Sequence, residues 1–217
     1  MEVIKIALAK GRLAEKSVDL FESIGVVFSQ FHEESRKLIF KSDHQQFEMI
    51  LVKATDVATY VENGAADIGV AGKDTLLESE ADVYEVIDLG FGKCRFAVAG
   101  KEDTDLNGMI KPRIASKYPK VTTDYFEQKG KQIETIKLNG SVELAPLVGL
   151  SDAIVDIVET GGTLKENGLV VLEDMVQSSA RLICNKASFK TKGESIQPFI
   201  ENVQDMIKQS EGEKANA

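Results

Sequence analysis

The sequence predicts an α/β protein built from two similar lobes with a cleft between them. Apolar runs of strand length alternate with amphipathic helical segments along most of the chain, which is typical of α/β folds. Glycine follows several of the helical segments, at the position where it commonly ends a helix. A short pattern also occurs twice, because Gly64-Ala-Ala-Asp67 and Gly149-Leu-Ser-Asp152 each place a glycine and an aspartate before an apolar run. This repeat favours two lobes of the same kind.

Length and charge exclude several classes of protein. The chain has 217 residues, 43% of them hydrophobic and 28% charged, and this is enough for two small lobes that each bury a core. A formal net charge of −9 argues against nonspecific nucleic-acid binding, which needs a basic surface. No apolar run approaches the ~18 residues of a membrane span, and the N-terminal run VIKIALA is short and contains a lysine. We therefore expect no membrane span and no signal peptide, and a cytoplasmic location.

Cysteine and histidine usage limits the chemistry. The two cysteines, Cys94 and Cys184, lie in apolar runs without metal-ligand spacing, so we expect buried free thiols in a reducing compartment. The two histidines, His32 and His44, both lie in a polar region. A histidine-based zinc site or a serine–histidine triad therefore has little to build on.

The first half of the chain is expected to form a sheet with basic residues at one edge. Residues 2–9 and 47–54 are predicted strands, and residues 66–78 are predicted to form a strand, a glycine turn and a helix. One helix is expected over 13–24 and another up to Asn63. Parallel strands in such an order would all end at the same edge.

Four basic residues follow these strands. Lys10 and Arg12 flank Gly11 after the first strand, Lys53 ends the second, and Lys73 stands at the turn after the third. Ligands gather at the carboxyl ends of strands in open α/β sheets, so these residues are candidates for binding an anion. A single lysine at such a place is most often solvated surface, but three on one edge favour a site.

The second half continues the alternation. Helices are expected over 122–130, 141–149 and 194–208, the second with Ser141 as its N-cap and Pro146 inside it. The expected strands are 83–92, 93–100, 113–118, 133–140, 152–158, 169–177 and 178–186.

The chain is expected to cross twice between the lobes, which makes the first lobe discontinuous. Residues 1–91 plus 178–208 form this first lobe, and residues 92–177 form the second. Residues 209–217 contain no apolar residue except alanine, so we expect a disordered tail.

The segment after the predicted strand 152–158 carries the main candidate site. It consists of Glu159, Thr160, Gly161, Gly162 and Thr163. Two glycines let the backbone bend tightly, so that successive N–H groups point into one concave nest suited to a phosphate, and the threonines add hydroxyl donors. Asp156 and Glu159 offer acceptors to sugar hydroxyls or to a magnesium-bound diphosphate. The alternative is an ordinary strand-to-helix turn in which the glycines serve geometry only.

Four segments resemble, in order and across nearly the whole chain, the short form of ATP phosphoribosyltransferase. They are LAKGRL (8–13), VKATDVATYVENGAADIGVAGKD (52–74), LNGSVELAP (138–146) and DAIVDIVETGGTL (152–164). The resemblance implies two periplasmic-binding-protein-like (type II) lobes with the active site in the cleft between them. It also implies the first step of histidine biosynthesis, in which ATP and phosphoribosyl pyrophosphate (PRPP) give N1-(5-phosphoribosyl)-ATP and diphosphate, with Mg²⁺ as the cofactor.

The resemblance also assigns roles to residues. Thr160, Gly161, Gly162 and Thr163 would bind the PRPP 5-phosphate, and Asp156 and Glu159 would face the ribose and the metal, for which no protein ligand is certain. Lys10, Gly11, Arg12, Lys53 and Lys73 would serve ATP and diphosphate, with Lys10, Arg12, Lys53 and Glu159 as the catalytic group. The segment of Gly140, Ser141, Val142 and Glu143 would add backbone donors from the facing lobe.

A regulatory partner is a further implication. The sequence ends without the additional domain of the long form, so the resemblance implies a hetero-oligomer, a hetero-octamer being one form, with a regulatory subunit related to histidyl-tRNA synthetase. Two other functions stay open. A nucleobase phosphoribosyltransferase usually shows two adjacent acids in its loop, whereas Asp156 and Glu159 are separated here. A non-catalytic lobe pair that binds an anion would show no turnover of ATP with PRPP.

Overall fold

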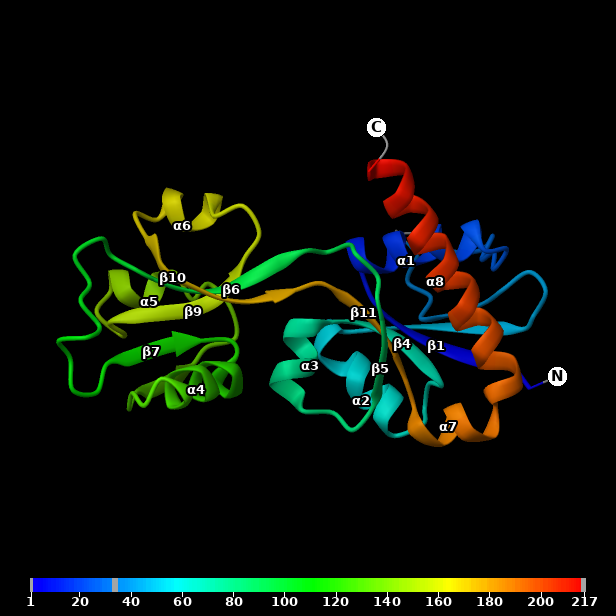
Figure 1. Cartoon of the computed structure of the whole chain (residues 1–217), viewed down its shortest axis with the longest axis horizontal. Coiled ribbons are helices and arrows are strands. Elements are labelled where there is room, and N and C mark those ends of the chain that lie inside the picture. Colours follow the sequence, from blue (N-terminus) through cyan, green and yellow to red (C-terminus); the bar gives the residue numbers. More distant parts are fainter. Residues whose placement is uncertain (1, 33–34, 216–217) are drawn as a thin grey trace. The chain divides into compact units, whose positions relative to one another are not determined.

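The computed structural model of the chain describes residues 2–32 and 35–215 (Figure 1). The chain forms two compact units, each with its own sheet. Unit 1 comprises Met1–Gly92 and Ser179–Ala217, and unit 2 comprises Lys93–Ser178. None of the helices in the described ranges is both long enough and apolar enough to cross a membrane.

Unit 1 contains a six-stranded sheet in the order β2-β3-β1-β4-β11-β5. Its strands are β1 (Ile4–Ala9), β2 (Ile39–Lys41), β3 (Phe47–Val52), β4 (Ile68–Gly72), β5 (Tyr84–Asp88) and β11 (Ala180–Cys184). Strand β1 is parallel to both β3 and β4, while β11 is antiparallel to β4 and β5. The carboxyl ends of β1, β3 and β4 therefore lie at one edge of the sheet, as the sequence predicts.

Helices cover both faces of this sheet. They are α1 (Arg12–Ser23), α2 (Val57–Glu62, preceded by the 3₁₀ turn Ala54–Asp56), α3 (Lys73–Ser79), α7 (Lys186–Thr191) and α8 (Gly193–Ala215). On one face α1 and α8 pack together, with the rings of Phe21 and Phe199 at 5.2 Å. On the other face Val57 and Val61 of α2 pack against Ile183 of β11. Burial of these apolar side chains is the main stabilising contribution to the unit.

Unit 2 contains a five-stranded sheet in the order β10-β6-β9-β7-β8. Its elements are β6 (Cys94–Gly100), β7 (Arg113–Ser116), α4 (Pro119–Gln128), β8 (Glu134–Lys137), α5 (Leu144–Leu147), β9 (Ala153–Val158), α6 (Gly162–Glu166) and β10 (Val170–Ser178). Strand β7 is parallel to β8 and β9, and β6 is antiparallel to β9. The row β8-β7-β9-β6 has the same directions as β3-β1-β4-β11 in unit 1, so the prediction of two similar lobes is confirmed.

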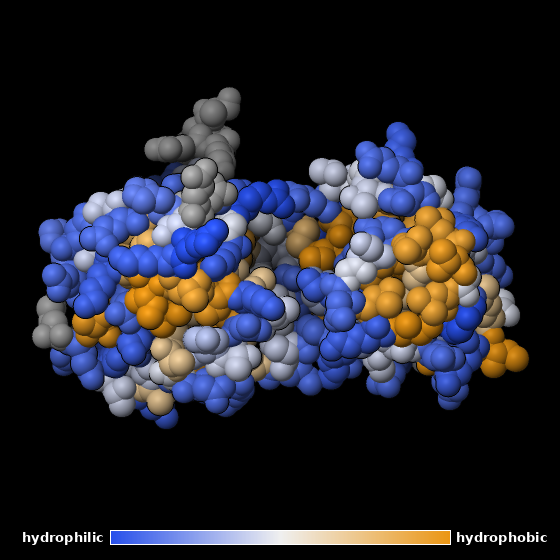
Figure 2. Space-filling model, turned by 180° about the vertical axis from the view of Figure 1, so that it is seen from behind, coloured by the Kyte–Doolittle hydropathy of each residue, from blue (hydrophilic) through white to orange (hydrophobic). Residues whose placement is uncertain are grey.

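The surface carries apolar side chains as well as charges. Figure 2 shows orange patches on both units among the polar residues of one face. Around α5 the exposed large apolar residues are Leu144, Leu147, Val148 and Leu150. Val148 and Leu150 follow the helix, in the segment that leads to β9.

The ends of several helices differ from the prediction. Helix α4 begins at Pro119 rather than 122, because proline is favoured in the first helical turn, where its missing N–H is not needed. Helix α8 continues to Ala215 instead of ending at 208, since the segment after 208 is rich in glutamate, lysine and alanine, which favour helix. Residues 216–217 of the expected tail lie outside the described residues.

The expected helix over 141–149 is the largest difference. Only Leu144–Leu147 is helical, and Ser141 does not cap it, because its backbone adopts a left-handed conformation with φ of 49°. Helix α7 was not predicted at all. Its N-cap is Asn185, whose side-chain oxygen accepts a hydrogen bond from the backbone N–H of Ser188 at 2.8 Å.

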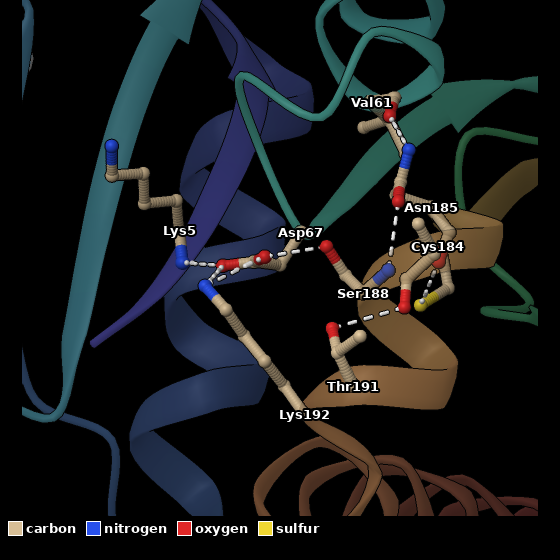
Figure 3. Close-up of polar contacts among 9 residues, drawn as sticks. Lys5, Val61, Asp67, Cys184, Asn185, Ser188, Thr191 and Lys192 are labelled. Carbon is tan, nitrogen blue, oxygen red and sulfur yellow. Dashed lines mark hydrogen bonds and ion pairs between the residues drawn. The ribbon is translucent and has the colours of Figure 1, made fainter. Parts of the chain in front are cut away.

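A buried aspartate links β4 to the C-terminal helices (Figure 3). Asp67 accepts hydrogen bonds from the Ser188 hydroxyl at 2.7 Å and from the backbone N–H of Lys5 at 2.8 Å. The ammonium of Lys192 lies 3.0 Å from the same carboxylate, whose side chain is 4% exposed. The buried carboxylate of Asp67 is thus both hydrogen-bonded and paired with a cation, as a buried charge requires. These contacts connect α7 and α8 to the sheet.

Candidate active site

The basic edge of unit 1 is built by three strand ends. Lys10 is the first residue after β1, Lys53 the first after β3, and Lys73 the first after β4. The backbone N–H of Lys10 donates to the carbonyl of Val52 at 3.1 Å, so the ends of β1 and β3 are joined directly. Lys10 and Lys53 are exposed, and neither has an ion pair with any residue of the ranges that the structure describes. Both ammonium groups are available to an anion.

Gly11 makes the turn between Lys10 and Arg12 possible. Its φ of 92° and ψ of −158° lie in a region of backbone conformation that is almost restricted to glycine. An added Cβ would meet no atom within 4 Å, so the constraint is the backbone and not space. Helix α1 starts here, and the Gly11 carbonyl accepts from the N–H of Ala14 at 2.8 Å. The KGR motif therefore presents two cations from a tight strand-to-helix turn.

Lys73 differs from the other two lysines. Its ammonium forms an ion pair with Glu85 of β5, and Arg181 of β11 lies 3.4 Å from the same carboxylate. The side chain of Lys73 is 27% exposed. A ligand anion would have to compete with Glu85 for Lys73, which makes a structural role for this lysine the simpler interpretation.

The loop 159–163 of unit 2 follows β9 directly. Gly161 has a left-handed φ of 79° and is the N-cap of α6, where its carbonyl accepts from the N–H of Lys165 at 3.1 Å. The N–H of Gly162 lies 3.4 Å from the hydroxyl oxygen of Thr160. Glu159, Thr160, Gly162 and Thr163 are exposed, whereas Leu164 is only 6% exposed. Leu164 thus holds the loop on the core while its polar groups stay open to a ligand.

The two glycines of this loop have different reasons to be glycine. At Gly161 the positive φ strains any other residue. At Gly162 the φ is ordinary, and an added Cβ would meet only the Thr160 hydroxyl oxygen, at 3.6 Å. The fold therefore does not require glycine at 162. A ligand that comes close to the backbone at this position gives a reason for glycine at 162.

Two acids accompany the loop. Asp156 is half-buried in β9, opposite Ala97 of β6, and Glu159 is exposed one residue after the strand. Among the described residues no three histidine, cysteine, aspartate or glutamate side chains form a group that could hold a metal. Magnesium commonly binds through substrate phosphates with one or two carboxylates, and the pair of Asp156 and Glu159 fits that manner of binding.

The segment 140–143 belongs to unit 2, as does the loop 159–163. Val142 is 1% exposed and packs in one core cluster with Val158 and Leu164. This burial anchors the segment beside β9 and α6.

One cation at the sheet edge of unit 2 was not among the predicted site residues. Lys117 is exposed and is the first residue after β7, as Lys10 is after β1. The available signal was the run RIAS followed by lysine, which has the same form as a buried strand followed by Lys10.

Comparison with solved structures places the fold in a known class. The periplasmic aliphatic sulphonate binding protein SsuA from Escherichia coli matches with a TM-score of 0.61 at 14% identity, covering 100% of this chain and 76% of that chain. The ATP phosphoribosyl transferase (HisG:HisZ) complex from Thermotoga maritima matches with a TM-score of 0.83 at 38% identity, covering 95% of this chain and 100% of that chain. The fold is that of two periplasmic-binding-protein-like (type II) units, as predicted.

Sequence relatives identify the family within that class. Residues 53–205 match the family model HisG: ATP phosphoribosyltransferase. An ATP phosphoribosyltransferase of Clostridium novyi (strain NT) is 57% identical over 210 residues, covering 95% of this chain and 99% of the relative. That of Bacillus mycoides (strain KBAB4) is 54% identical over 207 residues, covering 95% and 98%. The chain belongs to the ATP phosphoribosyltransferase family. It is a pentosyltransferase of histidine biosynthesis, and the predicted reaction of ATP with PRPP is confirmed.

Proposed function

We propose that the loop 159–163 binds the 5-phosphate of PRPP and that Lys10, Arg12 and Lys53 bind ATP and the diphosphate. The observation that carries the loop assignment is Gly162, where the backbone is relaxed and an added Cβ would be tolerated by the fold. Exposed hydroxyls of Thr160 and Thr163 flank it. A phosphate at this position would use backbone N–H groups that a side chain at 162 would obstruct.

The proposed mechanism depends on charge and position. The ribosyl C1 becomes cation-like as the C1–O bond to diphosphate breaks and N1 of ATP attacks. Lys10, Arg12 and Lys53 would neutralise the charge that grows on the leaving diphosphate, and Asp156 and Glu159 would orient the ribose hydroxyls. No general base is needed, because adenine N1 is itself a nucleophile. In this scheme Glu159 touches the reacting sugar.

We also propose Mg²⁺ as the cofactor. Asp156 and Glu159 are the residues that would hold it, together with the diphosphate of the substrate. When bound, it would supply positive charge at that diphosphate. The chain's own acids then have two roles, toward the sugar and toward the metal, and both depend on their position at the end of β9.

The partner and location are proposals of the same kind. The solved relative from Thermotoga maritima is a HisG:HisZ complex, which supports a regulatory partner for this chain. We propose that this partner is related to histidyl-tRNA synthetase, that the assembly is a hetero-oligomer, and that it acts in the cytoplasm. We further propose that this chain has two domains, with the bounds expected from its sequence. The first comprises residues 1–91 plus 178–208, and the second comprises residues 92–177.

The test of the loop assignment compares three glycine variants of the full chain. Gly162→Ala should weaken PRPP binding about tenfold or more with an unchanged thermal midpoint, because only the ligand position is filled. Gly161→Ala should lower stability by about 1–2 kcal/mol through its left-handed backbone. Gly193→Ala is the matched control, since its Cβ would meet no atom within 4 Å and its φ is not positive. PRPP affinity of Gly162→Ala equal to that of Gly193→Ala would contradict the assignment.

A further inference from the structure

We propose that Lys117 is a further substrate-binding residue of unit 2, and that its ammonium binds the 5-phosphate of PRPP beside the loop 159–163. The inference rests on the proposed function of that loop. It adds a cation from a neighbouring strand to a site that the loop alone supplies with N–H and hydroxyl donors.

The strand register places Lys117 next to Asp156. Strands β7 and β9 are parallel, with Ala115 opposite Ile154 and Ser116 opposite Val155. One further residue along both strands brings Lys117 to the level of Asp156. Because parallel strands end at the same edge, Lys117 and the loop after β9 share that edge of the sheet.

Asp156 lies on the same face of the sheet as the loop's anchor, Leu164. Ala115, Ile154 and Val158 pack in one core cluster with Leu164 of α6. Side chains two residues apart lie on one face of a strand, so Asp156 is on this face. Lys117 follows the last residue of β7, and its ammonium lies over the Tyr118 ring. What Lys117 shares with the loop is therefore the edge of the sheet.

Lys137 provides a contrast. It ends β8, opposite Ser116, and is exposed like Lys117. The residue before it, Ile136, packs on the cluster that includes Leu164, so alternation directs Lys137 to the other face of the sheet. The two lysines have the same charge and follow parallel strands, but β7 lies beside β9 whereas β8 does not.

The backbone around Lys117 is fixed on both sides. The hydroxyl of Ser116, which is 0% exposed, donates to the carbonyl of Val155 at 2.7 Å and accepts from the N–H of Tyr118 at 2.9 Å. The Tyr118 ring packs edge-on against Phe96 with ring centroids 4.9 Å apart. Lys117 is thus an exposed side chain on a well-supported backbone, which suits a residue that must meet a ligand at a defined place.

The charge of Lys117 is not neutralised by an acid. Its ammonium lies 5.7 Å from the centroid of the Tyr118 ring and forms no hydrogen bond or ion pair with residues 2–32 or 35–215. Some other cations of the unit are paired, for example Arg113 with Asp152 and Lys129 with Glu173, whereas Lys137, among the described residues, has no ion pair either. In a chain with a net charge of −9, an unpaired cation beside a phosphate loop is a local source of positive potential.

The experiment measures ligand affinity of the full chain by calorimetry with Mg²⁺ present. Lys117→Met keeps the length of the side chain and removes its charge, and should weaken PRPP and ribose 5-phosphate about tenfold while inorganic diphosphate is unaffected. Lys117→Arg should restore most of the affinity. Lys137→Met is the matched control and should bind all three ligands as the unaltered chain does. Thermal midpoints should stay unchanged in all three variants.

Each contrary result has a distinct meaning. PRPP affinity of Lys117→Met within twofold of that of Lys137→Met would overturn the inference. Loss of diphosphate affinity instead of ribose 5-phosphate affinity would overturn the assignment to the 5-phosphate. If Gly162→Ala weakens PRPP binding and Lys117→Met does not, only the lysine assignment is wrong. If neither variant has an effect, or if the unaltered chain binds no PRPP, the loop assignment fails and this inference with it.

Discussion

Asp67 and Asp152 make the same pair of contacts in the two units. The carboxylate of Asp67 accepts from the N–H of Lys5 at 2.8 Å, and its own N–H donates to the Lys5 carbonyl at 2.9 Å. Asp152 accepts from the N–H of Arg113 at 2.7 Å and donates to its carbonyl at 2.8 Å. Each aspartate thereby joins the start of one strand to its parallel neighbour, which explains the repeated pattern that ends in aspartate.

The first prediction concerns the more buried of the two. Asp67→Ala should lower the free energy of unfolding by about 3–5 kcal/mol, because Lys192 would keep a charge without its partner at a site that is only 20% exposed. Urea denaturation of the purified chain is the measurement. As a control, Asp205→Ala removes an exposed ion pair with Lys208 and should cost no more than about 1 kcal/mol. Equal effects of the two substitutions would contradict the structural role of Asp67.

The second prediction is a pH dependence at Asp152. Hydrogen bonds from the backbone N–H and the guanidinium of Arg113 lower the pKa of Asp152 below its ordinary value of 3.8. A lowered folded-state pKa stabilises the fold above about pH 3.8, and this contribution is lost as the pH falls through the folded pKa. Asp152→Asn should therefore be less stable than the unaltered chain by about 1 kcal/mol near neutral pH.

The measurement for Asp152 is the thermal midpoint of both proteins between pH 7 and pH 2.5. Their difference should shrink as the solution becomes acidic. A difference that stays constant over this range would mean that the carboxylate charge does not contribute.

The third prediction tests the basic edge of unit 1. Lys10→Met, Arg12→Met and Lys53→Met should each lower kcat/KM on the order of 10²-fold, because each removes a contact to a group that gains charge in the transition state. Lys208→Met, which changes an exposed lysine of α8, is the control and should keep normal kinetics. Product absorbance follows the reaction. A loss at Lys208 as large as that at Lys10 would count against a local site.

The fourth prediction separates catalysis from folding at Glu159. Glu159 is exposed, so Glu159→Gln should leave the thermal midpoint unchanged while kcat/KM falls on the order of 10²-fold. Asp156 is half-buried, so Asp156→Asn should lower both the thermal midpoint and kcat/KM. Normal turnover of Glu159→Gln at saturating Mg²⁺ would remove Glu159 from the mechanism.

The fifth prediction concerns feedback. Control of one site by a second ligand requires two sites and two states of the protein that the ligands favour differently. We expect histidine to leave the isolated chain unaffected and to inhibit only when the regulatory subunit is present. Calorimetry of the chain alone with histidine is the direct measurement. Saturable histidine binding to this chain alone, at a site where PRPP does not compete, would locate the switch here.

Local sequence determined most of the elements and the candidate loop. The alternation of apolar runs and helical segments located all three strands that precede Lys10, Lys53 and Lys73, because strand and helix periodicity are properties of adjacent residues. The motif around Gly161 and the family resemblance depend on residues that are close in the chain. These features could be read without knowing how the segments pack.

Tertiary structure decided what depends on residues far apart in the sequence. Lys192 meets Asp67 across 125 residues, although its sequence context is that of an ordinary charged residue. Lys73, predicted to serve a ligand anion, is paired with Glu85. Ser141 takes a left-handed conformation where its residue type favours a cap, because Val142 is held in the core of unit 2. Lys117 became a candidate substrate-binding residue only through the register of β7 with β9, which places it near Asp156. Strand pairing, ion pairing and side-chain burial determine which of the locally permitted conformations each segment adopts. These contacts depend on the whole chain, because they join residues that are far apart in the sequence.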